Sequence, residues 1–360
     1  MKDRIYVCHT YYHAYIACVK ELVLPAEKRG GAALVLSSMS NDFRDLKERA
    51  ERSGIFGEVI TFDEKEDVFF PELAPLKKDT GNILRNMINR IRFCRRFAEL
   101  EAPFVPVDFR LYKDIYVFCD SDPIGYYLAG NRIRYHAVED GLDCLRYYDT
   151  ARYDNRGHFR LKAFMAALGL IFIQNGYSRY CIDMEVNDLS VLPFPVPKAV
   201  EARREELAAK LTPDDRERLT RLFIANRGEL DAKLDAAAGD GRPTVLVLTE
   251  PLCGLETRKR LFADLIRENG TVDGAEGLIV IKPHPRDVLD YAPLFPDAVV
   301  LDKFFPMEIL NFIDGLMFDR VVTVYTVPSS LHCVKEAVYL GDDFMDRYEA
   351  PEIHRQNEQV

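Results

Sequence analysis

Short apolar segments that alternate with stretches of helical composition constrain the fold of this chain most. In the first half they have the length and β-branched content of strands, and they are RIYVCHT (4–10), AALVLSS (32–38), FGEVITFD (56–63), DIYVFCD (114–120) and IRYHAVEDG (133–141). AALVLSS is apolar almost throughout, which is typical of a strand buried on both faces of a parallel sheet. Helices are predicted between strands, at 14–25 and 82–100. The first half is therefore predicted to be an α/β domain.

The same alternation returns after residues 199–240, a segment rich in Ala, Glu, Arg and Lys. Beyond it, strands are predicted at 244–250, 277–285, 298–304 and 320–330, and helices at 256–270, 306–317 and 331–341. This order is typical of a doubly wound sheet. We therefore predict an α/β fold with two Rossmann-like doubly wound domains facing a cleft. The expected domains are 1–198 and 241–360, joined by a charged helical linker, 199–240.

Composition excludes several classes of protein. Lys and Arg number 48 against 58 Asp and Glu, a net charge of −10 that argues against a nucleic-acid binder. The N-terminus lacks the basic start and cleavage site of a signal peptide, and the longest apolar run, 163–173, is shorter than the roughly 20 residues that span a bilayer. The eight cysteines are scattered without a CxxC pair, so we predict no disulfide frame, no metal site and a cytoplasmic location.

A histidine between two prolines ends one predicted strand of the second half. His284 stands between Pro283 and Pro285, with Lys282 and Arg286 beside them, so a stiff turn is predicted just past the strand. An imidazole with two flanking cations suits a phosphate, which a donating or protonated histidine would stabilise as it departs. The alternative is a turn histidine that caps backbone groups.

Two further groups follow strands of the second half. Glu308 comes after Pro306 at the start of a predicted helix, where it would cap the helix or bind a ribose diol. Ser329 and Ser330 end the strand at 320–330 and open the next predicted helix, a favourable seat for an anion. One serine could equally be a simple helix cap.

The first half offers an acidic turn at the end of a strand. Glu139 and Asp140 precede Gly141, and adjacent carboxylates repel each other, which raises the pKa of one of them toward the range of a general base. An ordinary acidic turn is the alternative. Asp120 and Asp122 are interpreted as turn formers. His9, His13, His136 and His332 are isolated in the sequence and are interpreted as hydrogen-bonded structural residues.

The glycine pattern bears on two common nucleotide cofactors. The glycines form neither GxGxxG nor a phosphate loop of the Walker type, which counts against NAD and ATP.

Together, these motifs resemble those of bacterial sialyltransferases of the GT-B type. The acidic pair with its glycine is followed by KPHP, by Glu308 24 positions after the histidine, and by Ser329 and Ser330 45 and 46 positions after it. The order is most similar to that of glycosyltransferase family 52, the lipooligosaccharide sialyltransferase group. The stretches VCHTYYH (7–13) and LTEPL (248–252) are also similar to this family.

The resemblance implies transfer of sialic acid from CMP-sialic acid to a sugar hydroxyl of a glycan or glycolipid, with inversion, without an obligatory metal and without a cofactor. It implies that Glu139 is the general base, with Asp140 and Gly141 shaping its turn. Glu250 and Glu256 are rival bases, in the loop after VLVLT. Near the donor it implies roles for the following residues: His284 as acid, Glu308 as ribose ligand, and Lys282, Pro285, Arg286, Ser329 and Ser330 around the phosphate.

Other functions and partners stay open at this point. A CDP-glycerol-type glycerophosphotransferase of wall-polymer synthesis would carry a similar HP turn and serine seat, and a non-catalytic relative would bind a sugar nucleotide without turnover. The basic stretch from Arg85 to Arg96 is compatible with an anionic glycolipid, with peripheral contact at the inner face of the membrane, or with a solvated helix face. The segment 199–240 is compatible with exchange between subunits of a homodimer.

Overall fold

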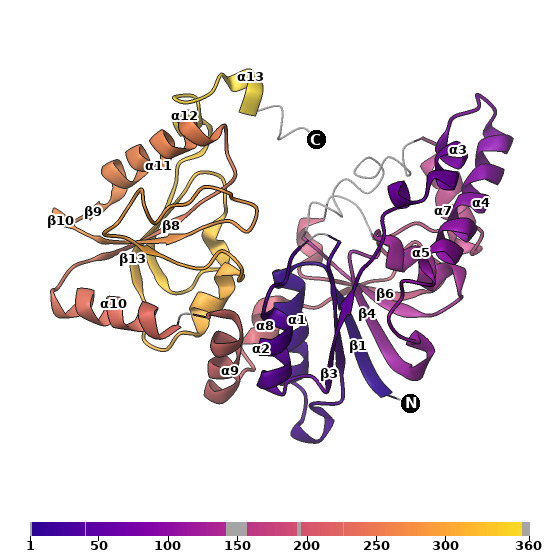
Figure 1. Cartoon of the computed structure of the whole chain (residues 1–360), viewed down its shortest axis with the longest axis horizontal. Coiled ribbons are helices and arrows are strands. Elements are labelled where there is room, and N and C mark those ends of the chain that lie inside the picture. Colours follow the sequence, from indigo (N-terminus) through magenta and orange to yellow (C-terminus); the bar gives the residue numbers. More distant parts are fainter. Residues whose placement is uncertain (1, 40, 142–156, 193–195, 226, 355–360) are drawn as a thin grey trace. The chain divides into compact units, whose positions relative to one another are not determined.

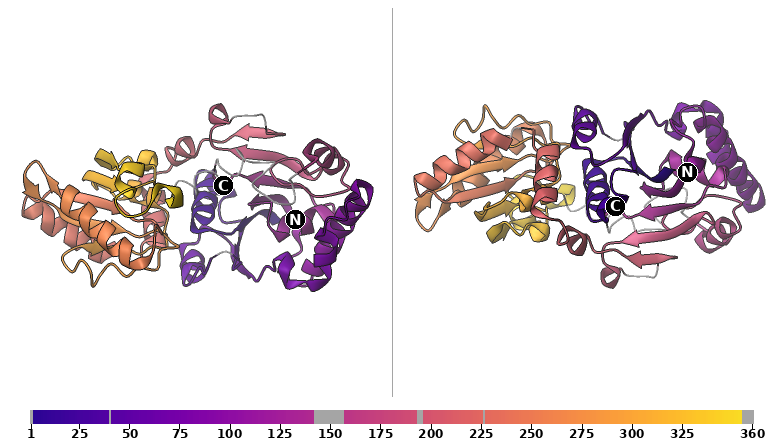
Figure 2. Two further views of the ribbon diagram at one scale, coloured as in Figure 1. Left: turned by 90° about the horizontal axis from the view of Figure 1, so that it is seen from above. Right: turned by 90° about the horizontal axis from the view of Figure 1, so that it is seen from below.

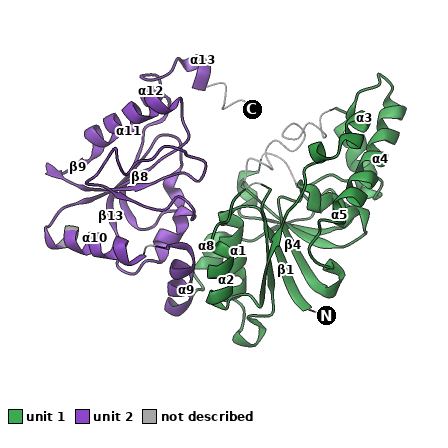
Figure 3. Cartoon of the chain, viewed as in Figure 1, with its two compact units in different colours: residues 1–212 green, residues 213–360 purple. Residues whose placement is uncertain are grey.

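The computed structural model of the chain divides into two compact units, residues 1–212 and 213–360 (Figure 3). It describes residues 2–39, 41–141, 157–192, 196–225 and 227–354. Each unit is built on its own parallel sheet (Figure 1). The prediction of an α/β fold with two Rossmann-like parallel sheets is therefore confirmed.

The sheet of unit 1 has seven parallel strands in the order β3-β2-β1-β4-β5-β6-β7. The strands are β1 (Lys2–Cys8), β2 (Ala33–Ser37), β3 (Glu58–Phe62), β4 (Tyr112–Phe118), β5 (Tyr135–Val138), β6 (Cys181–Val186) and β7 (Ala199–Glu201). Successive residues of a strand point to opposite faces, and Val7 and Cys8 are both fully buried. Both faces of the sheet are therefore covered, as the apolar character of AALVLSS predicted.

The helices of unit 1 connect these strands and cover the sheet (Figures 1 and 2). They are α1 (Tyr11–Leu22), α2 (Leu46–Ser53), α3 (Ala74–Lys77), α4 (Ile83–Glu101), α5 (Pro123–Gly130), α7 (Phe159–Ala167) and α8 (Arg204–Ala208). Side-chain caps fix where two of them begin. The side chain of Thr10 accepts a hydrogen bond from the amide of His13 at the start of α1, and the side chain of Asn82 accepts one from the amide of Arg85 at the start of α4.

Unit 2 contains a five-stranded parallel sheet in the order β12-β11-β8-β13-β14. Its strands are β8 (Thr244–Leu248), β11 (Leu278–Lys282), β12 (Val299–Val300), β13 (Phe318–Thr323) and β14 (Val334–Tyr339), and a separate hairpin pairs β9 (Thr271–Val272) with β10 (Ala275–Glu276). The helices are α9 (Pro213–Phe223), α10 (Arg227–Gly239), α11 (Leu255–Asn269), α12 (Gly341–Met345) and α13 (Pro351–His354). None of the helices in the described ranges combines the length and apolar character needed to cross a bilayer.

Two of the predicted helices are wrong. Residues 331–341 contain the edge strand β14, because Lys335 and Glu336 form ion pairs with Asp319 and Arg320 of the neighbouring β13, and the charged residues suit an exposed edge. Residues 306–317 form only a short 3-10 helix over Met307–Phe312. Strands β6 and β7 were not predicted at all.

The segment 199–240, expected as a linker, is shared between the units. Its first residues form β7 of the first sheet and α8, which packs on α1. Its remainder forms α9 and α10 of unit 2. The boundary between units therefore falls at Thr212 and Pro213.

In both sheets the strand order reverses beside the first strand. The reversal lies between β1 and β4 in unit 1 and between β8 and β13 in unit 2. In open parallel sheets, ligands bind outside the carboxyl ends of the strands at such a switch point. The loops after these four strands are therefore where a site is expected.

Close packing of α5 against the loop after β4 gives a test of this arrangement. A Cβ atom on Gly125 would lie 1.8 Å from the carbonyl oxygen of Asp120, whereas one on Gly228 in α10 would meet nothing within 4 Å. We expect Gly125→Ala to lower the free energy of unfolding by about 3 kcal/mol, since overpacking shifts backbone. Gly228→Ala should leave it unchanged or raise it slightly. Urea denaturation measures both, and equal stability of the two variants would contradict the packing described.

Candidate active site

In unit 1, one buried carboxylate ties together the loops at the carboxyl edge of the sheet. Glu64, just after β3, accepts hydrogen bonds from Ser37 Oγ at the end of β2 (2.6 Å) and from the amide of Ile124 in α5 (2.7 Å). His9 Nε2, at the end of β1, lies 2.7 Å from Glu64 Oε2, the oxygen that also accepts from Ser37. A second carboxylate, that of Asp122, lies 3.5 Å from the same ring nitrogen. Loops from four strands are thus held in one cluster.

His9 carries a positive charge in this cluster. Burial by itself would lower the pKa of His9, but Glu64, with smaller contributions from Asp122 and Asp140, outweighs burial and raises the pKa to about 9. Its Nδ1 atom is buried and has no hydrogen-bond partner within the described ranges. The first loop of the switch point therefore holds an imidazolium at neutral pH.

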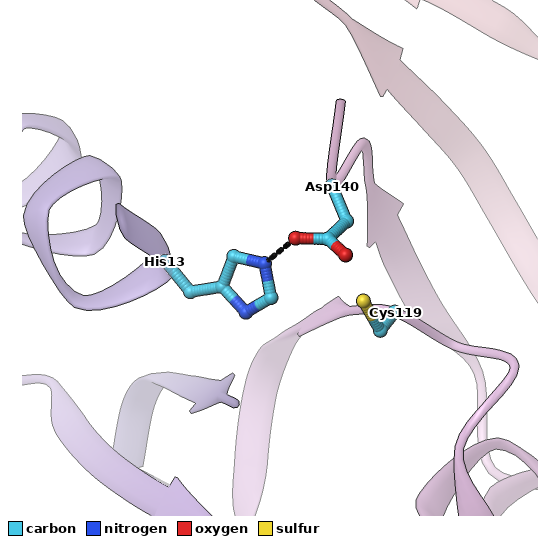
Figure 4. A group of neighbouring side chains, drawn as sticks. All are labelled: His13, Cys119 and Asp140. Carbon is cyan, nitrogen blue, oxygen red and sulfur yellow. Dashed lines mark hydrogen bonds and ion pairs between the residues drawn. The ribbon is translucent and has the colours of Figure 1, made fainter. Parts of the chain in front are cut away.

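A second histidine, His13, orients Asp140. It lies in the first turn of α1 and stacks on Phe118, with ring centroids 4.7 Å apart. The amide of His9 donates to its Nδ1 (3.1 Å), so the ring carries its proton on Nε2, which contacts Asp140 Oδ1 (Figure 4). Burial lowers the pKa of His13, so the ring is a neutral donor.

A group of residues that could hold a metal ion lies at the same point of unit 1. His13, Cys119 and Asp140 each offer one ligand atom, and these atoms lie within 4.8 Å of one another (Figure 4). Imidazole, thiolate and carboxylate together would suit zinc. However, a metal at Nε2 requires the ring proton on Nδ1, and Nδ1 already accepts the amide of His9. The contacts therefore favour a hydrogen-bonded carboxylate over a metal ligand set.

The two adjacent carboxylates after β5 differ in environment. Glu139 is only 6% exposed, and its carboxylate accepts the amide of Asn187 (2.6 Å). Burial raises the pKa of Glu139, and the charge of Asp140 adds a smaller increase. Burial would also raise the pKa of Asp140, but the hydrogen bond from His13 outweighs it and lowers the pKa. The side chain of Asp140 is 34% exposed. Gly141 has a φ of 109°, a positive value that glycine adopts without strain.

In unit 2, the turn at His284 is anchored by a buried carboxylate. Asp287 accepts hydrogen bonds from Thr249 Oγ1 (2.9 Å), Arg258 Nη1 (2.6 Å) and Tyr291 Oη (2.7 Å). Thr249 in turn accepts the amide of His284 (3.2 Å). The loops after β8 and β11 are therefore joined directly beneath the histidine.

His284 is held as a neutral donor. The amide of Arg286 donates to its Nδ1 (3.1 Å), which leaves the proton on Nε2, an atom without a partner within the described ranges. Burial, together with the charges of Arg286 and Lys282, lowers the pKa of His284 to about 4. At neutral pH the ring therefore offers an N–H to a ligand rather than an acidic proton.

The neighbours of His284 do not point the same way. Lys282 is buried, and its ammonium donates to the carbonyl groups of Pro283 and Lys303 and lies over the ring of Phe305. Burial lowers the pKa of Lys282 to about 7. Lys282 therefore braces the turn from inside. Pro285 is half-buried, and Arg286 is exposed.

Two of the predicted donor-binding residues contact each other. Ser330 Oγ donates to Glu308 Oε1 (3.1 Å), and the carbonyl of Ser330 accepts the side chain of Asn311. Burial raises the pKa of Glu308. Ser329 is exposed beside them. The expected α-helix after the serines is absent within the described range, since Pro328–Ser330 form a single 3-10 turn that leads into β14, so no helix terminus supports the anion seat.

The rival bases have other partners. Glu250 is buried, and its carboxylate accepts the amides of Tyr325 and Thr326, so it joins the loops after β8 and β13 at the switch point. Glu256, in the first turn of α11, is exposed and pairs with Lys259 (2.6 Å).

Comparison with known proteins places the chain in a family. The sequence model of glycosyltransferase family 52 matches residues 89–333. The chain belongs to glycosyltransferase family 52. The family resemblance inferred from short motifs is therefore confirmed.

Individual relatives are more distant or match only in part. An uncharacterised protein of Haemophilus influenzae is 42% identical over 63 residues, which span 18% of this chain and only 20% of that relative. Among solved structures, the GT-B domain of a sialyltransferase from Photobacterium damselae is 10% identical, with 91% of this chain and 86% of that chain covered and a TM-score of 0.49. Arabidopsis thaliana UGT89C1, solved with UDP, is 10% identical over 94% and 86% of the two chains, with a TM-score of 0.45. Neither structural likeness bears on the substrate of this family 52 protein.

Sequence reasoning missed the polar cluster of unit 1. His9 and His13 are neighbours whose rings lie 6.2 Å apart, and Asp120 is a buried acceptor for Tyr135 Oη and the amide of Asn175 rather than a plain turn former. Both histidines follow β1 in the stretch VCHTYYH, and this position at a strand end was the available signal. Glu64 carried no comparable signal.

The raised pKa of His9 predicts a pH dependence of stability. Its folded-state pKa of about 9 exceeds the ordinary value of 6.5, so the stabilisation is complete below pH 6.5 and is lost as the pH rises through 9. We expect a loss of about 3–4 kcal/mol in the free energy of unfolding across this window, at roughly 1.4 kcal/mol per pKa unit.

Urea denaturation at several pH values measures this loss. It should vanish in Glu64→Gln and persist in Glu58→Gln, whose pairing with Lys2 is on the surface. Titration of the His9 ring by NMR with a midpoint below 7 would contradict the charge assignment.

Proposed function

We propose that this family 52 protein transfers sialic acid from CMP-sialic acid to a hydroxyl of a surface glycan such as lipooligosaccharide, with inversion and without a metal. The observation that carries the proposal is the state of His284 beyond β11. Its ring is fixed between two prolines, its Nδ1 is occupied by the amide of Arg286, and its Nε2–H remains for a ligand.

A neutral His284 suits CMP as the leaving group. CMP departs with negative charge developing on an oxygen of its phosphate. A preorganised N–H directed at that oxygen lowers the barrier, because it does not need to reorganise. The exposed Arg286 supplies a full positive charge two residues away. Glu308 and Ser330, linked by their hydrogen bond, are assigned to the ribose and phosphate of the donor.

For activation of the acceptor hydroxyl, access favours Asp140 over the predicted base, Glu139. A general base must lie within hydrogen-bond reach of the proton that it removes. Glu139 is buried and accepts the amide of Asn187, whereas a third of the Asp140 side chain is exposed. We therefore assign the proton transfer to Asp140, with His13 as its positioning residue and Glu139 as a support of the turn.

The proposed roles place a condition on how the substrates bind. Inversion by in-line displacement requires the base and the leaving group on opposite faces of the anomeric carbon. The carboxylate comes from the edge of the first sheet and the imidazole from the edge of the second. The acceptor would bind to unit 1. There, Ser121 and Asp122 of the loop after β4 line a cavity of about 260 Å³.

Release of CMP from two donors tests the proposed function. We expect release from CMP-sialic acid but not from CDP-glycerol, and a decrease in kcat of about 100-fold or more in His284→Ala, the usual cost of losing one preorganised donor. Release from CDP-glycerol alone would identify a glycerophosphotransferase instead. Tight binding of CMP-sialic acid with neither hydrolysis nor transfer to a glycan would favour a non-catalytic relative.

The choice of base is tested within one dipeptide. Asp140→Asn should lower kcat by about 100- to 10,000-fold, the usual contribution of a general base, with little change in KM for the donor. Glu139→Gln keeps its acceptor oxygen for Asn187 and should lose at most about tenfold. The reverse order of the two effects, measured with a glycan acceptor, would restore Glu139 as the base.

A further inference from the structure

A buried glutamine turns its side-chain amide into a cavity of unit 1. Gln174, in the segment between α7 and β6, is only 7% exposed, and it lines the cavity of about 260 Å³ beside the loop after β4. Its side-chain amide has no hydrogen-bond partner within the described ranges. The oxygen and nitrogen of this amide are not among the described polar atoms that are sealed from solvent, so they face the open space of the cavity.

The backbone on both sides of Gln174 is held in place. The amide of Asn175 donates to the buried carboxylate of Asp120 (3.0 Å). The ring of Phe172 packs on that of Tyr126 in α5, with ring centroids 4.7 Å apart. A polar group whose neighbours are fixed in this way binds a ligand with little loss of conformational freedom. The amide of Gln174 is therefore a preorganised contact, and a ligand that both donates and accepts hydrogen bonds would satisfy it.

The residues that line this space are of two kinds. Phe93, Phe97 and Tyr126 supply aromatic rings, and Asp122 and Gln174 supply polar groups. We call the space the Gln174 cavity. A sugar ring has the same double character, since its C–H groups pack on aromatic rings and its hydroxyls donate and accept hydrogen bonds. The volume lies below the roughly 300–1,000 Å³ of pockets for drug-sized ligands, which suits a single ring.

The charges around the Gln174 cavity favour an uncharged ligand. Asp67 forms an ion pair with Lys77 (2.6 Å), and Asp122 lies 3.5 Å from the charged ring of His9. Glu66 also lines the cavity and is exposed. Within the described part of the chain, no lining residue offers an unpaired positive charge to an anion. The carboxylate of a sialic acid would meet acidic side chains here, so the cavity does not suit the sugar of the proposed donor.

We propose that the Gln174 cavity holds one neutral ring of the acceptor glycan, and that Gln174 determines acceptor specificity by hydrogen bonds to a hydroxyl or acetamido group of that ring. This role rests on the proposed function, because only a glycosyltransferase has an acceptor. A site built to hydrogen-bond a hydroxyl discriminates against a substrate that lacks it, since the polar group of the protein is then left unpaired.

Binding of methyl glycosides to the full-length chain tests the class of ligand. Saturation-transfer NMR with competition should show that methyl glucoside or methyl galactoside binds at least about tenfold more tightly than the matching uronic acid, because the added carboxylate meets like charges. The members of each pair differ only at C6. Equal or tighter binding of the uronic acids, or no binding of any neutral glycoside, would overturn the proposal.

A double-mutant cycle tests the role of Gln174. Gln174→Met should raise KM for the best neutral acceptor by about tenfold, the effect of one hydrogen bond, with a smaller change in KM for CMP-sialic acid. Among the monodeoxy derivatives of that acceptor, one should cost the wild type a similar factor and cost the variant almost nothing more, because the hydroxyl and the amide act as a pair. Asn269→Leu, which removes a side-chain amide of α11 in unit 2, should leave KM for the acceptor unchanged.

Failure of this role and failure of the proposed function give different results. Transfer with additive effects of Gln174→Met and every deoxy derivative, or equal effects of Gln174→Met and Asn269→Leu, would overturn the role of Gln174 and leave the sialyltransferase assignment intact. Glycoside binding that Gln174→Met weakens, without transfer from CMP-sialic acid, would support the Gln174 cavity as a sugar site and reject the proposed function. Thermal unfolding checks each variant, and Gln174→Leu replaces Gln174→Met if the latter does not fold.

Discussion

In each unit, a buried carboxylate that accepts hydrogen bonds from several loops holds the loops at the carboxyl edge of the sheet in place. Glu64 joins loops after four strands of the first sheet, and Asp287 joins the loops after β8 and β11 of the second to α11. A buried carboxylate is costly unless its oxygens are satisfied, so each of these loops is fixed to the geometry that supplies a donor. Loss of one donor would leave part of a charge uncompensated, which makes the arrangement cooperative.

This anchoring accounts for the orientation of the groups assigned to catalysis. Thr249 connects Asp287 to the amide of His284, and the amide of Arg286 fixes the tautomer of the ring. In unit 1 the His9 amide fixes the tautomer of His13 in the same way. A hydrogen-bond donor whose position and proton are set before the substrate binds needs little reorganisation to reach the transition state. Backbone amides thus set the chemistry of both histidines.

The sequence was informative about positions along strands and weak about contacts between distant segments. Glu139, His284 and Ser329 all follow apolar strands, and parallel strands bring such ends to one edge, so the location of these groups could be predicted. The contact of His9 with Glu64 joins residues 55 positions apart and depends on strand order, which no local pattern encodes.

Side-chain direction was harder still to predict. Lys282 flanks the histidine in sequence but faces the interior, because it is the last residue of a strand whose neighbours alternate between faces. Residues 331–341 have the composition of a helix, yet ion pairs across to β13 favour a strand. In both cases tertiary contacts outweighed local preference.

The two carboxylates after β5 illustrate how access and basicity compete. Burial raises the pKa of Glu139, which would make it the stronger base, while the hydrogen bond of His13 lowers that of Asp140 and weakens it. A base acts only where it reaches the substrate and only while it is ionised. Asp140 meets both conditions at neutral pH, and the proton of a sugar hydroxyl becomes easier to remove as the bond to the anomeric carbon forms. A weaker but exposed and ionised carboxylate therefore serves this reaction better than a more basic one held inside the fold.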